Sequence, residues 1–246
     1  MLFNLVLILP VLISLASGGT SAPPQGALIF IEDRPAFTSA DRTAQNKAIY
    51  LNDRGKVQRY VSEDHTIKAF AESALDVANC FKTLSALSFK SLPTGPVPAD
   101  ENQPPSQAGP GHTRLVLRQA PGVEYIWEGT TTLVPTELRK LLEEARALAA
   151  QARPAAATGV FVRADLMSAQ RRDEYRAMRL LRQVENLKDL TPVLQEALAH
   201  PFCLISAPSG ENPLAAFAVK GAPSQVHIVF QDTGYELSRY SSGPPP

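Results

Sequence analysis

The sequence predicts an α+β fold in two small lobes, each with antiparallel strands and a packed helix. Three observations predict it: short apolar runs of strand length, two stretches with apolar residues at helical spacing, and a weak internal repeat. Strands segregated from helices are typical of the α+β class.

Residues 1–22 have the layout of a secretory signal peptide. The run from Leu2 to Ala16 is almost entirely apolar, and small residues follow it. At roughly 15 residues, this run is shorter than the ~20 that a transmembrane helix needs. We therefore expect cleavage after Gly18 or Ala22, a secreted or periplasmic location, and no stable membrane insertion of the mature chain. An uncleaved N-terminal anchor is the alternative.

The first lobe is expected over residues 25–150. Residues 27–32 form an apolar run of strand length, and residues 47–51 and 56–61 flank a hairpin turn at residues 52–55. Apolar residues then recur every three or four positions up to Leu84, which predicts a long helix whose first turn carries Ser62 as its cap.

The rest of this lobe contains a loop, two strands and a second helix. Residues 96–111 are rich in Pro, Gly and Gln, which predicts a disordered loop. Strands are expected at 113–119 and 123–128, on either side of a turn. Pro135 suits the first turn of a helix whose apolar face is Leu138, Leu141, Leu142, Ala145, Leu148 and Ala149.

An alanine-rich linker at residues 151–158 separates the second lobe, residues 159–242, and a disordered tail is expected at 243–246. In this lobe we expect strands at 160–162, 215–220 and 228–230, and a short helix opening at Thr191-Pro192. Residues 171–187 have helical spacing, but their place in the repeat corresponds to a hairpin, and both alternatives stay open.

The internal repeat links a helix to a two-stranded unit in each half. Ser91-Leu92-Pro93-Thr94-Gly95 is matched by Ser206-Ala207-Pro208-Ser209-Gly210, and Ala120-Pro121 is matched by Ala222-Pro223. This order of elements indicates an internal duplication. The alternative is one continuous domain in which the resemblance is accidental.

Charge and motifs exclude several classes of function. Lys plus Arg and Asp plus Glu both total 24, which argues against nucleic acid as a partner. The sequence has no glycine pattern for phosphate binding, no close pair among its 4 histidines and no nucleophile motif. We therefore predict no cofactor, no metal site and no catalytic residue.

Five residues are candidates for contact with a protein partner. Tyr125 and Trp127 alternate along one predicted strand, and exposure of either would indicate a recognition site, whereas the alternative is sheet packing. Arg172, Arg176 and Arg179 would share a helix face that attracts an acidic partner, and the alternative is a solvated face. Cys80 and Cys203 could form one disulfide after export, or each could be a buried thiol.

These observations favour an exported, non-catalytic binding or inhibitory protein that acts on another macromolecule. The alternative is a secreted hydrolase whose site is assembled in space from Glu63, Asp64, His65 and His200, since catalytic groups need no local motif.

Overall fold

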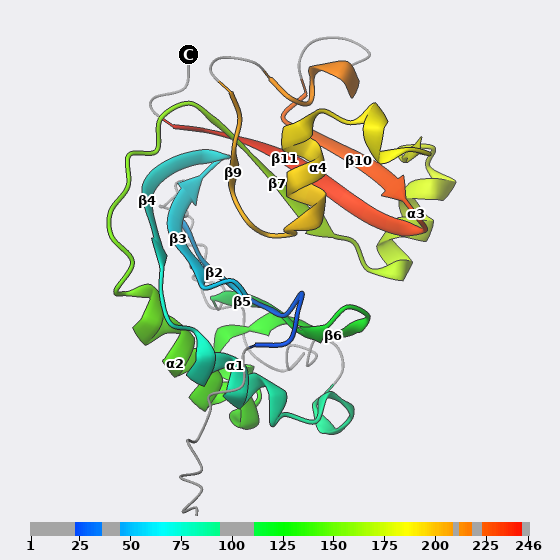
Figure 1. Ribbon diagram of the computed structural model, residues 1–246. Helices are drawn as coiled ribbons and strands as arrows, with labels where there is room; N and C mark the ends of the chain where they lie inside the picture. Colours follow the sequence, from blue (N-terminus) through cyan, green and yellow to red (C-terminus); the bar gives the residue numbers. More distant parts are fainter. Residues whose placement is uncertain (1–22, 36–44, 94–110, 209–211, 218–222, 243–246) are drawn as a thin grey trace, which may run out of the picture.

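The computed structural model describes residues 23–35, 45–93, 111–208, 212–217 and 223–242. Within these residues eleven strands pair into one continuous sheet, and four α-helices accompany it (Figure 1). The predicted mixture of helices and strands is therefore confirmed. The signal peptide, all of the 96–111 loop except Gly111, and the 243–246 tail lie outside the described residues.

The N-terminal part of the sheet is antiparallel, in the order β6-β5-β1-β2-β3-β4. Short turns join β2 to β3 and β5 to β6, as the turn residues at 52–55 and 121–122 predict. The strands are β1 (Leu28–Arg34), β2 (Asn46–Asn52), β3 (Lys56–Glu63), β4 (Thr66–Ala74), β5 (His112–Ala120) and β6 (Val123–Thr130).

The C-terminal part of the sheet is centred on β11 (Thr233–Ser242), which pairs antiparallel with β10 (Gln225–Phe230) and β7 (Val160–Leu166). Two small strands complete it: β8 (Arg182–Val184) beside β10, and β9 (Ile205–Ser206) beside β7. Two residue pairs at the end of β11 join it in parallel to the start of β4. This short contact makes the two parts one sheet.

The α-helices are α1 (Ala78–Ser85), α2 (Arg139–Ala149), α3 (Ala169–Ala177) and α4 (Pro192–Ala199). Single 3-10 turns occur at η1 (Phe89–Ser91), η2 (Thr131–Leu133), η3 (Thr136–Leu138), η4 (Leu187–Asp189) and η5 (Ala215–Phe217). The expected apolar face of α2 is confirmed, with all but Leu148 fully buried. Pro192 opens α4, also as predicted.

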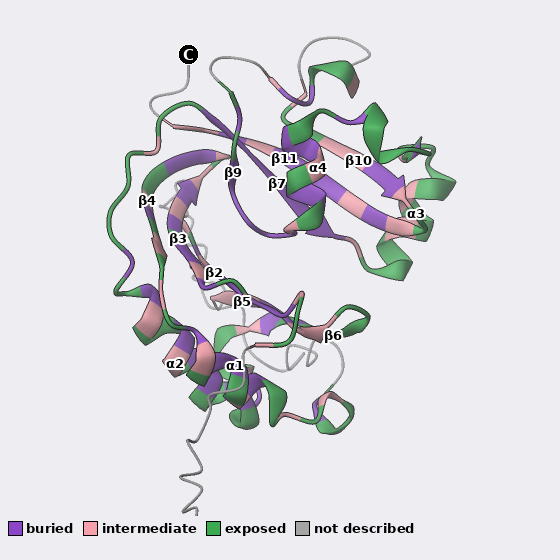
Figure 2. Cartoon of the chain, viewed as in Figure 1, coloured by how far each residue is buried: buried purple, intermediate pink, exposed green. Residues whose placement is uncertain are grey.

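The N-terminal sheet separates two hydrophobic cores. Ile29 and Ile31 of β1 face α1 and α2, whereas Leu28 and Phe30 face a core shared with the C-terminal half. Burial on both faces explains why β1 is a continuous apolar run rather than an alternating one. Phe30 stacks on Phe202 at 4.7 Å between ring centroids, so the second core joins the N-terminal and C-terminal halves. Figure 2 shows buried segments in both halves.

The helix predicted from Ser62 to Leu84 is wrong over most of its length. Ser62 is buried in β3, the chain turns at Asp64 and His65, and β4 then pairs with β3. Both turn residues have positive φ, 44° and 60°, as a two-residue hairpin turn requires. Only the last part, α1, is helical. Pairing between strands therefore overrides the local helical spacing.

Three other segments also depart from expectation. Residues 171–187 are neither one helix nor a hairpin, because α3 ends at Ala177 and β8 follows. Residues 215–217 form a 3-10 turn rather than a strand. The 151–158 linker runs along β4, where Ala155 N–H donates to the Phe70 carbonyl at 3.0 Å.

Candidate functional site

Strand β6 presents different side chains on its two faces. Tyr125 and Trp127 are 4% and 0% exposed, and they pack in the core beneath α1 and α2. The Tyr125 hydroxyl donates to the Pro93 carbonyl at 2.9 Å. The structure therefore shows the sheet-packing alternative for both residues, and neither ring is available to a partner.

The opposite face of β6 is accessible. Ile126 is 39% exposed, although it is a large apolar side chain on a strand. Glu124 and Glu128 are also exposed and lie two residues on either side of Ile126. Successive side chains of a strand alternate between faces, so Glu124, Ile126 and Glu128 form one row.

The outer edge of β6 is open in the described part of the chain. β6 pairs with β5 alone, and it is the terminal strand of the sheet order. At about 3.4 Å per residue, its eight residues present an edge of about 27 Å. Unpaired N–H and C=O groups on such an edge are a template for another strand.

Acidic groups mark this edge. Arg118 of β5 donates through Nε to Glu124 at 2.6 Å, so the Glu124 charge is largely compensated. Glu128 lies 3.9 Å from His112, a contact that carries charge only when the imidazole is protonated. Glu128 is therefore the less compensated carboxylate of the row.

Of the three arginines predicted to share a face, Arg172 and Arg176 lie one turn apart in α3, and Arg179 lies outside it. Arg172 in α3 donates to the Asp232 carbonyl at 2.6 Å and ties the helix to the β10–β11 turn. Arg176 lies 3.8 Å from Asp173 one turn earlier. Arg179 lies beyond the end of α3 with a positive φ of 58°. The prediction of a common helix face is therefore wrong for Arg179, because α3 ends at Ala177, whereas Arg172 and Arg176 do lie on one helix.

The groups considered for a hydrolase occupy two different places. His65 lies at the β3–β4 turn, packs on Tyr240, and has its pKa lowered by burial and by Arg163. Glu63 pairs with Lys68 at 3.4 Å rather than with His65.

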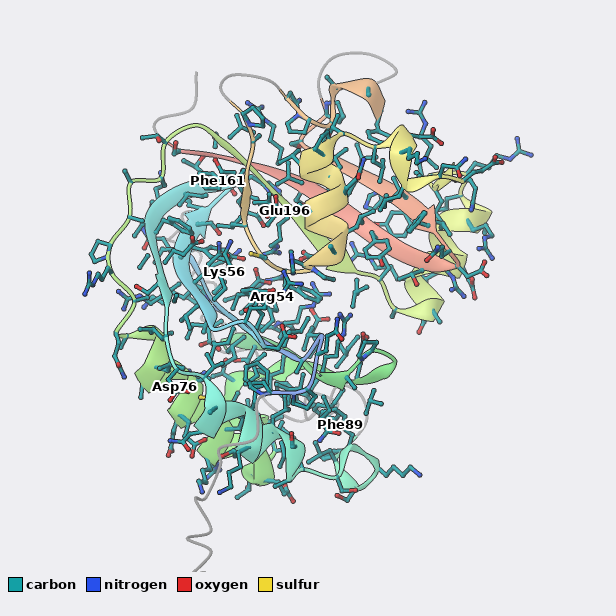
Figure 3. All side chains as sticks on the ribbon, in the orientation of Figure 1. Arg54, Lys56, Asp76, Phe89, Phe161 and Glu196 are labelled. Atoms are coloured by element: carbon teal, nitrogen blue, oxygen red, sulfur yellow. The ribbon has the colours of Figure 1, made fainter. Side chains whose placement is uncertain are left out.

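His200 follows α4 and lines a cavity of about 380 Å³ with Arg54, and burial and Arg54 lower its pKa. Figure 3 shows Arg54 in the zone where the two halves meet. His65 and His200 have no charged neighbour in common, so the structure does not bring the two imidazoles into one site.

A buried ionic network lies between the halves, and sequence reasoning missed it. Arg163 of β7 donates to Glu32 at 3.0 Å, to the Tyr60 hydroxyl at 2.7 Å, and to Asp165 at 2.6 Å. Burial alone would raise the pKa of Glu32, but Arg163 and Arg34 outweigh it and lower that pKa to about 2. Charged residues at alternate positions of the apolar run 160–166 were the available signal. Both carboxylates are paired with the guanidinium of Arg163, although Arg163 Nε and Asp165 Oδ1 have no hydrogen-bond partner among the described residues. We interpret the network as a structural link between the halves.

Both cysteines are buried free thiols, so the disulfide is not formed. Cys80 lies on the buried face of α1. Cys203 lies in the core between the halves, where its Sγ is 3.3 Å from Gln58 Oε1. Burial raises the pKa of Cys80 to about 11 and that of Cys203 to about 12. Neither thiol is activated as a nucleophile.

No known family model, curated protein or solved structure matches the chain. Its function must therefore be inferred from its own residues. In the described residues, no group of three or more His, Cys, Asp or Glu side chains could hold a metal ion. The same residues include no helix that is long and apolar enough to span a membrane.

Proposed function

We propose that the mature chain is an exported, non-catalytic binding protein that pairs an extended segment of a partner protein with the open edge of β6. The observation that carries the proposal is this edge itself, eight residues long and paired on one side only in the described part of the chain. Main-chain hydrogen bonds would supply affinity, and side-chain pockets would supply specificity.

The exposed row on β6 defines the chemistry of the partner segment. Directly opposed side chains on neighbouring strands interact, and unlike charges are favourable there. A strand added beside β6 would place one apolar residue opposite Ile126 and basic residues opposite Glu124 and Glu128. Because residues on one face of a strand are two positions apart, the partner is an extended segment with a basic, an apolar and a basic residue at every second position.

The test uses two synthetic peptides and measures binding by fluorescence anisotropy. One peptide has lysine, valine and lysine at every second position with threonine between them, and the other has glutamate in place of each lysine. We expect the lysine peptide to bind the wild-type chain more tightly. Glu128→Lys should reverse this preference, because it changes the sign of the least compensated charge on the edge.

The control for this reversal is Glu143→Lys, on the exposed side of α2, which should leave the preference unchanged. Ile126→Lys should weaken binding of both peptides, whereas Leu187→Lys, at a similarly exposed apolar residue, should not. If the wild type binds the two peptides with equal affinity, and Glu128→Lys does so too, the edge of β6 is not the site.

Export supports this proposal through the apolar run and small residues of the first 22 positions. N-terminal sequencing of secreted material should begin between Gly19 and Pro24. Recovery of intact Met1 in a soluble cytoplasmic fraction would exclude export.

We further propose that the two halves arose by duplication. In support, α1 precedes the β5–β6 hairpin as α4 precedes the β10–β11 hairpin. The strand pairing differs, since β1 pairs with the first strand of its hairpin and β7 with the second strand. Superposition of the two helix-and-hairpin units in an experimental structure should give the same handedness. Opposite handedness would favour an accidental resemblance.

A further inference from the structure

A hollow of about 560 Å³ lies on the face of β2, β3 and β4, away from the β6 edge. It is larger than the cavity beside His200, and it falls within the range of small-molecule sites, about 300 to 1,000 Å³. The peptide-binding proposal does not use it.

The strand register explains why the hollow exists. Val61 pairs with Ala69, and Arg59 pairs with Ala71, so alanines of β4 stand where larger side chains would fill the space. On the other side Ile49 pairs with Arg59. These residues share one face of the sheet.

The boundaries of the hollow come from α2 and the segment after it. α2 ends at Ala149, and the chain then places Pro154 in a bridge beside Ala71. Arg146 from the last turn of α2 lines the opening. Helix α2 therefore stops before it covers this part of the sheet.

Charge in the lining is mainly positive. Lys47, Arg59 and Arg146 supply three cations, against one carboxylate, Asp33. Asp33 is already engaged, since Arg146 donates to one of its oxygens at 3.0 Å and Thr113 to the other at 2.7 Å. Within the described residues, Lys47 and Arg59 have no ion-pair partner and both are exposed.

We infer that this hollow binds a small amphiphile with one carboxylate. Its apolar body lies on Ile49, Val61 and Ala69, and its carboxylate faces Lys47 and Arg59. Burial of the hydrocarbon against these apolar side chains is favourable. The two unpaired cations favour an anionic head group over a neutral or cationic one.

Isothermal titration of the mature chain with dodecanoate, dodecanol and dodecyltrimethylammonium tests the inference. We expect dodecanoate to bind, and the neutral and cationic analogues to bind at least tenfold more weakly. Arg59→Gln should weaken dodecanoate binding about three- to tenfold, since it removes one charge-assisted contact at a partly solvated site.

Two further variants separate this site from nonspecific binding. Ala69→Phe should abolish binding, because the ring occupies the hollow from an exposed position and leaves the core intact. Arg139→Gln, an exposed arginine of α2 outside the lining, should bind dodecanoate as wild type does. Fluorescence of the single tryptophan reports whether each variant is folded.

Equal affinity for dodecanoate and dodecanol would overturn the inference, as would unchanged dodecanoate binding in folded Ala69→Phe. Absence of dodecanoate binding to wild type at millimolar concentration would overturn it as well. The peptide experiment is independent of all three outcomes, because none of the hollow's lining residues lies on β6.

Discussion

Replacing Arg163 with methionine should strongly destabilise the protein, because it removes the cation at the centre of the buried network. The substitution leaves Glu32 and Asp165, 2% and 3% exposed, without their guanidinium partner. Arg34 still lies 2.9 Å from Glu32, and Arg114 lies 3.8 Å from Asp165. Neither contact replaces two buried hydrogen bonds.

The pKa of Glu32 is lowered from 4.5 to about 2 by Arg163 and Arg34 acting together against burial, so Arg163 stabilises the ionised carboxylate in the folded protein. Removing one partner of a buried ion pair typically costs about 3 to 5 kcal/mol. We therefore expect Arg163→Met to lower the free energy of unfolding by about 3 to 5 kcal/mol at pH 7.

The loss should also depend on pH. In the wild type, the stability from Glu32 is present above pH 4.5 and is lost as pH falls toward 2, because its folded pKa lies below its unfolded pKa. In Arg163→Met burial acts on Glu32 with less compensation and raises its pKa, so protonation relieves the folded variant. The difference in stability between wild type and variant should shrink on acidification from pH 7 to pH 3.

Urea unfolding followed by the fluorescence of Trp127, the single tryptophan and fully buried, measures both effects. The triple variant Arg163→Met, Glu32→Gln, Asp165→Asn should recover more than half of the loss, since it removes the unpaired charges. A loss below about 1 kcal/mol at pH 7, or a loss that does not change with pH, would refute the role assigned to the network.

In the same urea assay, Gly55→Ala should destabilise the protein by about 1 kcal/mol or more beyond the loss caused by Gly122→Ala. Both glycines have φ of +79°, but only at Gly55 would a Cβ meet the Leu75 carbonyl oxygen, at 2.7 Å. If both variants lose the same free energy of unfolding, the backbone near Leu75 moves to accept the Cβ and the prediction is wrong. Iodoacetamide at pH 8 should label neither Cys80 nor Cys203 in the folded protein and both after denaturation, because both are buried with raised pKa values. Intact mass showing fast labelling of the folded chain, or a disulfide, would contradict the structure.

Locally encoded elements could be predicted from the sequence. The β2–β3 hairpin has its turn residues at 52–55, and α2 has an apolar face that recurs over three turns. Strand β4, within the segment from Ser62 to Leu84, could not be predicted from local sequence. The apolar spacing of this segment is compatible with a helix, and its strand conformation comes from pairing with β3. Non-local pairing is not visible in the periodicity of one segment.

Tyr125 and Trp127, predicted as contact residues, lie in the core, and the row that we propose for binding lies on the opposite face of the same strand. The alternation along β6 separates Tyr125 and Trp127 from Ile126, yet it does not say which face the helices cover. Large aromatic residues suggested contact with a partner, and they instead fill the core. Likewise, the ionic partner of Arg163 in β1 lies 131 residues away, beyond the reach of any sequence motif.

Amide hydrogen exchange along β6, measured by NMR with and without the lysine and valine peptide, tests the central claim most directly. In the free protein, alternate amides of residues 123–130 point away from β5 and should exchange fast, because no described strand covers them. The peptide should slow exchange at these alternate amides and leave those of β5 unchanged, since β5 is paired on both sides. Protection elsewhere with none on β6, or slow exchange of every β6 amide in the free protein, would contradict the account.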